Sequence, residues 1–179
     1  MAEMLVEHKK ENLHVVILRP TIVTSTYKEP FPGWVEGVRT VDSCVIAYCK
    51  RKLSCLPGDI KAAIDVIPTD MVVNAIIVAM VANASKCSNN IYHVGSSIRN
   101  PIKYMNILDY FYEYSQKCHG WTRKGSQSRF DDRNMEKVEM AAKQGGVEMD
   151  LFYFDPKMID WEDYFMNVHF PGMVKYLIK

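Results

Sequence analysis

The residues of this sequence that could do acid–base chemistry include two tyrosines, each followed by a lysine four residues later. Tyr48 precedes Lys52, and Tyr153 precedes Lys157. On a helix this spacing places the ammonium beside the phenol, lowers the phenol pKa and makes the tyrosine a usable acid at neutral pH. Pro156 interrupts a helix within the second pair, and Lys52 lies where a lysine suits a helix C-terminus. We therefore interpret both pairs as chance matches.

Other signatures of catalysis and of ligand binding do not occur in the sequence. The nine glycines never form GxGxxG or GxxxxGK[ST], so these residues include no phosphate-binding loop. No GxSxG sequence supplies a nucleophilic serine. The five histidines form no HExxH or HxxxH pair, so we expect no metal site. On these grounds no catalytic residue can be named.

Charge, cysteine content and hydropathy exclude further classes of protein. Lysine and arginine number 22 and aspartate and glutamate 21, so the basic excess typical of nucleic-acid binding is missing and no nucleic-acid partner is expected. The longest apolar run, Met71–Ala82, is shorter than the roughly 20 residues of a membrane span and predicts a buried core helix. No CxxC pair occurs, so we expect reduced thiols at Cys44, Cys49, Cys55, Cys87 and Cys118.

The apolar pattern alternates between expected strands and expected helices. Strands are expected at residues 15–18, 53–56, 63–67 and 90–94. Helices are expected at residues 2–11, 34–52, 69–84 and 102–115. A loop rich in threonine, serine and proline fills residues 21–33, after Pro20 ends the first strand. Continuous apolar strands in alternation with helices predict an α/β fold with a parallel sheet that helices cover.

The sequence changes in character after residue 115. Residues 116–130 are polar and basic, and we interpret them as a solvated linker, with contacts to the phosphates of a charged ligand as the alternative. A helix is then expected from Asp131 or Asp132 to Gly145-Gly146. Asp160 caps a last helical stretch, which Pro171-Gly172 divides. The chain is thus divided into a domain at 1–115, a linker at 116–130 and a helical module at 131–179.

Several long blocks occur in the order in which one known family has them. They read VILRPTIVTSTYKEPFPGW at 16–34, IDVIPTDMVVNA at 64–75, IYHVGSS at 91–97, RNP at 99–101, DPK at 155–157 and DWEDYFM at 160–166. In these blocks the chain closely resembles the plant alcohol-forming fatty acyl-CoA reductases, the male sterility protein family. The resemblance extends over nearly the whole chain except about residues 116–129.

The resemblance implies an extended short-chain dehydrogenase fold. This chain would then form the C-terminal half of a doubly wound Rossmann-like sheet, followed by a short, mostly helical C-terminal module. The implied reaction is the NADPH-dependent reduction of long-chain acyl-CoA to a primary fatty alcohol by two hydride transfers, with a tyrosine as proton donor and a lysine one turn later. The cytosolic face of the endoplasmic reticulum or a plastid, with peripheral membrane association, is the implied location.

The sequence departs from the family in two places. The family's glycine-rich loop and its Tyr-x-x-x-Lys lie upstream of the strand that matches residues 15–18, and the resemblance implies that several dozen residues are absent near 116–130. We therefore expect an N-terminally truncated and internally shortened chain that is inactive alone, because hydride transfer needs a held cofactor. One alternative is a non-catalytic remnant that associates with itself or with full-length relatives through an exposed sheet edge. The other is a partial gene model of a longer product.

Site residues follow from the resemblance by position only. Pro20, Thr21, Ile22 and Val23 match the loop that lines the nicotinamide pocket through backbone groups, and a plain turn after a strand is the alternative. Phe31 and Trp34 would border the channel for the acyl chain. Asp65 and Asp70 match a block before the apolar helix, where roles at a strand end and as a helix N-cap are expected of them rather than catalysis.

Overall fold

The structure is a computed structural model. It describes residues 2–11, 13, 15–49, 52, 62–84, 90–116, 133–145 and 151–177. The strand expected at 53–56 lies outside the described residues, as do the expected helix start at Asp131 or Asp132 and all of the expected linker except Gln116.

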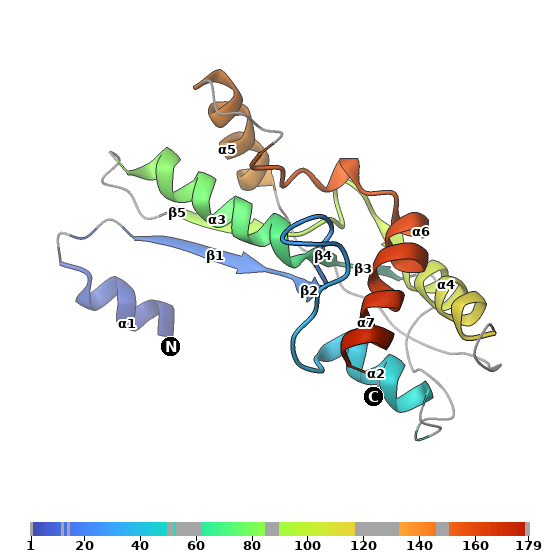
Figure 1. Ribbon diagram of the computed structural model, residues 1–179. Helices are drawn as coiled ribbons and strands as arrows, with labels where there is room; N and C mark the ends of the chain where they lie inside the picture. Colours follow the sequence, from blue (N-terminus) through green and yellow to red (C-terminus); the bar gives the residue numbers. More distant parts are fainter. Residues whose placement is uncertain are drawn as a thin grey trace.

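Two parallel strands form the part of the sheet that the sequence predicts best. β1 (Val16–Pro20) pairs with β5 (Asn90–Val94), from Val16 opposite Asn90 to Pro20 opposite Val94. Figure 1 shows α3 lying along this pair. Pro20 is the last residue of β1 and not the first residue after it, a strand end being a position where a missing N–H is tolerated.

Four short strands continue from the carboxyl ends of this pair. β2 (Ile22–Thr24) pairs in parallel with β4 (Val66–Pro68), and β3 (Ala63–Ile64) pairs antiparallel with β6 (Ile102–Lys103). The expected loop at 21–33 therefore begins with a strand. The single strand expected at 63–67 is two strands, because residues 63–64 pair with β6 and residues 66–68 pair with β2.

Among the described residues, five α-helices precede the C-terminal segment. They are α1 (Ala2–Lys9), α2 (Thr40–Cys49), α3 (Thr69–Asn83), α4 (Tyr104–Gln116) and α5 (Arg133–Gln144). The expected start of α3 is confirmed, whereas the helix expected from Trp34 begins only at Thr40. The Trp34 amide donates to Thr26 Oγ1 at 2.9 Å, and Gly37 has φ +76°, so residues 34–39 follow the loop instead of a helix.

The C-terminal segment is a short 3₁₀ turn followed by a continuous helical stretch at residues 161–176, with a wide turn in its middle. A 3₁₀ turn, η1 (Pro156–Met158), precedes α6 (Trp161–Asp163), the π-helix η2 (Tyr164–His169) and α7 (Phe170–Tyr176). Asp160 caps α6 as expected, and its Oδ1 accepts from the amides of Glu162 and Asp163. Pro171 does not divide the helix, because it lies in the first turn of α7, where a missing N–H is tolerated.

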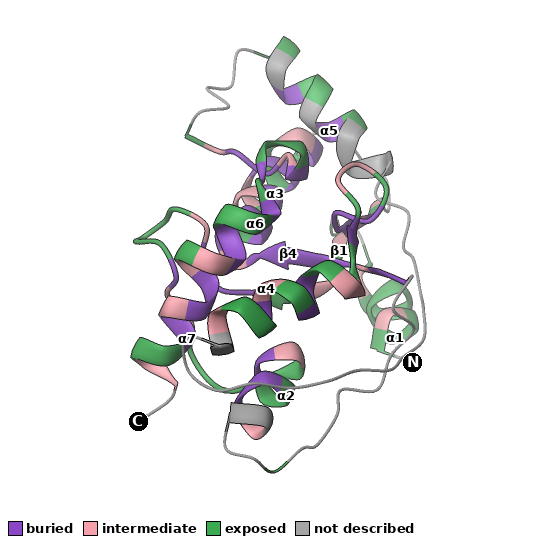
Figure 2. Ribbon diagram, turned by 90° about the vertical axis from the view of Figure 1, so that its right-hand side faces the viewer, coloured by how far each residue is buried: buried purple, intermediate pink, exposed green. Residues whose placement is uncertain are grey.

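The core lies between α3, the strands and the C-terminal helix (Figure 2). Its largest fully buried side chains include Tyr164, Phe165 and Phe170 from η2 and α7. α1 contributes no buried residue and lies far from α6 and α7 (Figure 1). Within the described ranges, no helix combines the length and the apolar character needed to cross a bilayer.

Candidate functional site

The loop at residues 20–34 follows β1 at the carboxyl edge of the sheet, where open α/β folds bind their ligands. Two backbone hydrogen bonds fix the start of this loop. The Thr21 amide donates to the Val94 carbonyl at 3.0 Å, and the Ile22 amide donates to the Asp65 carbonyl at 3.1 Å. The loop start is therefore held against the ends of two other segments of the sheet.

Asp65 fastens the chain after β5 to this edge. Its carboxylate is 5% exposed and accepts from the Ser96 amide at 2.7 Å, the Ser97 amide at 3.3 Å and the Ser97 hydroxyl. A Cβ at Gly95 would lie 2.6 Å from Asp65 Oδ1 and 2.7 Å from Thr21 Cγ2, so a side chain has no room there. Asp65 thus has the strand-end role that the sequence predicts.

Asp70 organises the middle of the loop from the first turn of α3. Its carboxylate accepts from the amides of Tyr27 at 2.8 Å, Lys28 at 2.8 Å and Glu29 at 3.1 Å, and from the Tyr153 hydroxyl. The predicted N-cap role is wrong, because the N-cap of α3 is Pro68 and Asp70 satisfies the loop amides instead. Burial raises the pKa of the Tyr153 phenol, and the hydrogen bond to Asp70 raises this pKa further.

A group of buried polar side chains, here called the polar cluster, ties the loop to the C-terminal helix. Its members, each at most 4% exposed, are Thr24, Ser25, Asp42, Tyr164 and His169. The Tyr164 hydroxyl donates to the Ser25 carbonyl at 2.7 Å and lies 2.8 Å from Thr24 Oγ1. His169 Nδ1 lies 2.9 Å from Ser25 Oγ, and its Nε2 lies 3.2 Å from Asp42 Oδ1. Burial raises the pKa of Tyr164, which keeps this phenol protonated.

The π-helix explains why Tyr164 and His169 meet the same serine. A π-turn closes over five residues instead of four, so residues 164 and 169 share one face. Their rings stack with centroids 5.8 Å apart and planes at 24°. The sequence analysis missed this arrangement, because Ser25 and His169 are 144 residues apart and no local motif marks either one.

A serine, a histidine and an aspartate in contact raise the question of nucleophilic catalysis. Ser25 is 0% exposed, so a substrate cannot reach its hydroxyl in this arrangement. The polar cluster therefore positions the loop and does not form a nucleophilic site.

Two hydroxyls at the carboxyl edge are buried without a hydrogen-bond partner among the described residues. They are Thr21 Oγ1, directly after β1, and Ser96 Oγ, two residues after β5. A buried hydroxyl without a partner is costly. Ser96 is 0% exposed and the Thr21 hydroxyl is equally shielded, so, as for Ser25, no ligand reaches either hydroxyl in this arrangement.

The structure brings some of the predicted site residues together and places others apart. Pro20, Thr21, Ile22 and Val23 all lie at the carboxyl edge, with Val23 37% exposed. Phe31 is 46% exposed, and its ring lies 6.3 Å from that of Tyr176 in α7. The half-buried Trp34 is fixed to the loop through Thr26.

Close backbone contact brings the far end of the loop against α7. Gly33 has φ +77°, and a Cβ at Gly172 would overlap the Gly33 carbonyl oxygen. Both positions therefore require glycine. The loop is held at both ends, by the sheet at Thr21 and by α7 at Gly33.

Other chemistry-bearing side chains have ordinary surroundings. In the part of the chain that the structure describes, no three histidine, cysteine, aspartate or glutamate side chains are placed to hold a metal ion. Cys44 is an exposed free thiol, and the side chains of the other four cysteines lie outside the described part. The phenol of Tyr153 is occupied by Asp70, and the Tyr48 side chain is not described.

Comparison with known families decides the assignment of the chain. A NAD-binding sequence model described as male sterility protein matches residues 1–76, and a second model with the same description matches residues 75–179. The chain belongs to the male sterility protein family. The NAD-binding model of this family agrees with the expected nicotinamide cofactor.

Fatty acyl-CoA reductases are among the relatives of this male sterility protein. It is 36% identical to the alcohol-forming fatty acyl-CoA reductase of Simmondsia chinensis and 32% identical to fatty acyl-CoA reductase 1 of Arabidopsis thaliana. Each alignment covers 100% of this chain and 51% of the relative. The human fatty acyl-CoA reductase 2 is 37% identical over 103 residues. The chain spans about half the length of the curated relatives from plants.

Solved structures share the fold of this male sterility protein at low sequence identity. The NAD complex of UDP-glucuronic acid 4-epimerase from Bacillus cereus has a TM-score of 0.59 and 14% identity, with 99% of this chain and 49% of that chain covered. A UDP-glucose 4-epimerase has a TM-score of 0.61 and 14% identity, with 97% and 53% covered. The predicted α/β class and the partial Rossmann-like sheet are therefore confirmed.

Proposed function

We propose that this chain supplies the substrate-side half of an NADPH-dependent reductase that converts long-chain acyl-CoA to a primary fatty alcohol. Its family and the names of its relatives support the reaction class. The observation that carries the proposal is the match of the family's NAD-binding model to residues 1–76, which include the loop start at Pro20–Val23.

The backbone of Pro20–Val23 would line the nicotinamide pocket at the carboxyl edge of the sheet, while Asp65 keeps the chain after β5 in place. When bound, the cofactor supplies the hydride for each of the two reductions. Phe31 and Trp34 would border the approach of the acyl-CoA along the loop.

The chain alone is proposed to have no turnover. Its 179 residues contain no glycine-rich phosphate loop, and its Tyr153–Lys157 pair does not have the helical geometry of a proton donor. Asp70 holds the Tyr153 phenol, and Pro156 interrupts the helix that the pairing with Lys157 needs. Fatty alcohol formed from palmitoyl-CoA and NADPH by the purified chain would contradict this part of the proposal.

A chimera tests the reaction itself. The N-terminal part of the Simmondsia chinensis reductase is joined ahead of residue 1, and palmitoyl-CoA is supplied with NADPH or NADH. We expect hexadecanol with NADPH, measured by gas chromatography, because the added part brings the missing motifs. Absence of product from a folded chimera, while the intact Simmondsia enzyme is active in the same assay, would refute the proposal.

One observation favours a second role, as a non-catalytic chain that associates with full-length relatives. Large apolar side chains are exposed along α3 and on β5, at Val73, Ile76, Met80, Val81 and Ile91. Exposed apolar surface of this kind favours association. Size-exclusion chromatography of the chain with light scattering tests this role, and a compact monomer at high concentration would count against it.

A further inference from the structure

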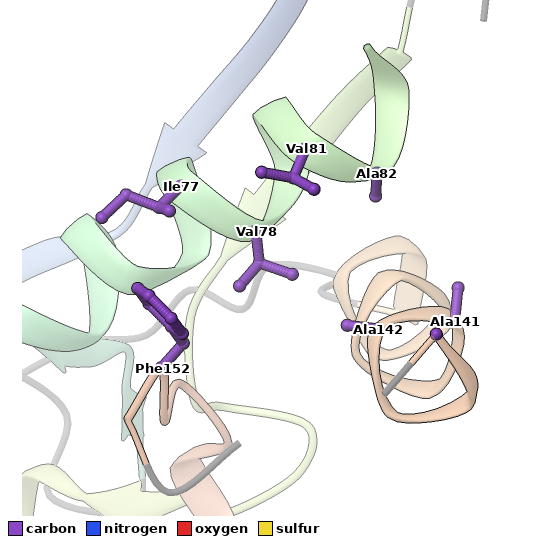
Figure 3. A pocket seen from close by; sticks show the side chains of 8 residues that line it. Ile77, Val78, Val81, Ala82, Ala141, Ala142 and Phe152 are labelled. Carbon is purple, nitrogen blue, oxygen red and sulfur yellow. The ribbon is translucent and has the colours of Figure 1, made fainter. Parts of the chain in front are cut away.

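A cavity of about 430 Å³ lies between α3, α5 and the segment before η1. The residues that shape it include Val78, Val81 and Ala82 of α3, Ala142 of α5, Gly145 directly after α5, and Phe152. Figure 3 shows the α3 side chains on one wall, α5 on the facing wall and Phe152 at one end. The cavity is separate from the polar cluster and contains none of the predicted site residues.

The size of the cavity suits a ligand. The cavity opens to solvent at Val81, which is 61% exposed, and reaches inward to the buried Val78. Pockets that bind small molecules measure about 300–1,000 Å³, a range that includes this cavity. The alanines of α5 and the glycine that follows this helix leave the space between the two helices unfilled.

The lining of the cavity defines the chemistry of that ligand. Every described residue that lines it is apolar, so no described side chain there would hydrogen-bond to a sugar, a phosphate or a carboxylate. A polar group placed there would lose its hydrogen bonds to water without replacement. Of the common ligand groups, a hydrocarbon chain is the one that this lining suits.

The cavity lies along α3 from the carboxyl edge of the sheet. α3 begins at Thr69, and Ile77 is eight residues later, which is about 12 Å along the helix axis. The neighbour of Phe152, Tyr153, donates to Asp70 at the start of α3 and contacts the Tyr27 ring with centroids 6.4 Å apart. One short segment thus connects the loop at residues 20–34 with the cavity wall.

We propose that the cavity between α3 and α5 binds the aliphatic tail of a long-chain acyl group. The identification of this group with an acyl-CoA rests on the proposed function, whereas the binding of a hydrocarbon chain does not. The thioester end then lies toward the carboxyl edge, and the tail ends between Val78 and Ala142. The length of the tail determines how much of the cavity is filled.

Binding to the purified full chain tests the proposal without any turnover. Isothermal titration calorimetry is done with decanoate, dodecanoate and tetradecanoate, and with palmitoyl-CoA against coenzyme A alone. We expect affinity to rise by roughly fourfold per buried methylene, because each removes apolar surface from water. Palmitoyl-CoA should bind and coenzyme A should not. Phosphatidylcholine vesicles distinguish a membrane source, and binding to vesicles with no binding of the monomeric chains would overturn the proposal.

Variants locate the bound tail. Ala82→Phe and Gly145→Leu fill the cavity from opposite walls and should weaken binding of tetradecanoate at least tenfold. Met80→Phe is the matched control, since Met80 is 62% exposed on the same helix and does not line the cavity. If Phe31→Ser weakens binding while Ala82→Phe does not, the tail lies along the loop at residues 20–34 and the proposal is wrong.

The outcome is separable from that of the proposed function. A chimera that reduces palmitoyl-CoA equally well with and without Ala82→Phe would support the proposed reaction and show that the cavity does not take part in it. If the chain binds tetradecanoate in the cavity but no chimera has reductase activity, the binding site is supported and the proposed reaction is refuted.

Discussion

The two ends of α3 are built in opposite ways. At its start, Asp70 accepts four hydrogen bonds, and the nearby polar cluster fixes Ser25 between Tyr164 and His169. Toward its end, α3 faces α5 across about 430 Å³ of unfilled apolar space. Hydrogen bonds are directional and fail when one partner moves, whereas apolar contact is non-directional and tolerates changes in shape. The polar end is therefore suited to hold a reacting group, and the apolar end is suited to accept tails of different length.

The largest effect expected from this contrast comes from two glycine substitutions. Gly172→Ala should lower the free energy of unfolding by more than about 3 kcal/mol, because the new Cβ overlaps the backbone of Gly33 and separates α7 from the loop. Gly145→Ala, beside the cavity, should change the free energy of unfolding by less than about 1 kcal/mol, since its Cβ would lie 3.4 Å from the Ala141 carbonyl oxygen. Guanidinium unfolding followed by circular dichroism measures both. Equal losses of stability in the two variants would show that the loop contact at Gly172 and the cavity wall at Gly145 are equally sensitive to an added methyl group.

A carboxylate substitution gives the next largest effect. Asp70→Asn should destabilise the chain by about 3 kcal/mol, because the amide nitrogen cannot accept hydrogen bonds from the loop amides and from Tyr153. Asp109→Asn on α4 is the control, since Asp109 is exposed, and its effect should stay within about 0.5 kcal/mol. Urea unfolding of the two variants compares them directly, and a loss below about 1 kcal/mol for Asp70→Asn would show that the loop does not depend on this carboxylate.

The parts of this arrangement that the sequence predicts are local ones. The apolar runs of β1, β5 and α3 and the Asp160 cap depend on neighbouring residues, so periodicity and capping rules find them. The expected helix at 34–52 fails where a tertiary contact, Trp34 with Thr26, overrides local preference. Only the family resemblance assigns residues 20–23 to the nicotinamide site, and this role stays a prediction.

The polar cluster and the cavity could not be predicted for a physical reason. Ser25 meets His169 across 144 residues, and this contact needs a π-turn that no residue pattern in the sequence indicates. The cavity arises from the spacing between two helices. In the sequence, nothing distinguishes Ala142 and Gly145 from other small residues, and only the position of α3 shows that they line a cavity. Long-range packing, not local propensity, creates both regions.

Buried tyrosines give the polar end a smaller, pH-dependent effect. Burial raises the pKa of Tyr153 and of Tyr164 above the ordinary value, so the folded chain retains protons that the unfolded chain releases. Stability from this source is fully present below about pH 10 and falls as the pH rises above it, by about 1.4 kcal/mol per pH unit for each tyrosine. Thermal unfolding between pH 8 and pH 11 should show a shallower decline for Tyr153→Phe than for the exposed Tyr112→Phe. Parallel declines would indicate that Asp70 does not hold a protonated phenol.

The smallest effect should come from filling the apolar end. Ala82→Leu adds apolar atoms to a space that already exists, so little strain results and the added surface leaves water. We expect a change in the free energy of unfolding of less than about 1 kcal/mol, toward greater stability, together with weaker binding of tetradecanoate. Loss of stability beyond about 2 kcal/mol would mean that α3 and α5 pack more tightly than the cavity implies. Increased stability with weakened binding would instead show that the two ends of α3 have different roles. The cavity end must stay open to bind a ligand, whereas the Asp70 end must keep every hydrogen bond to hold the loop.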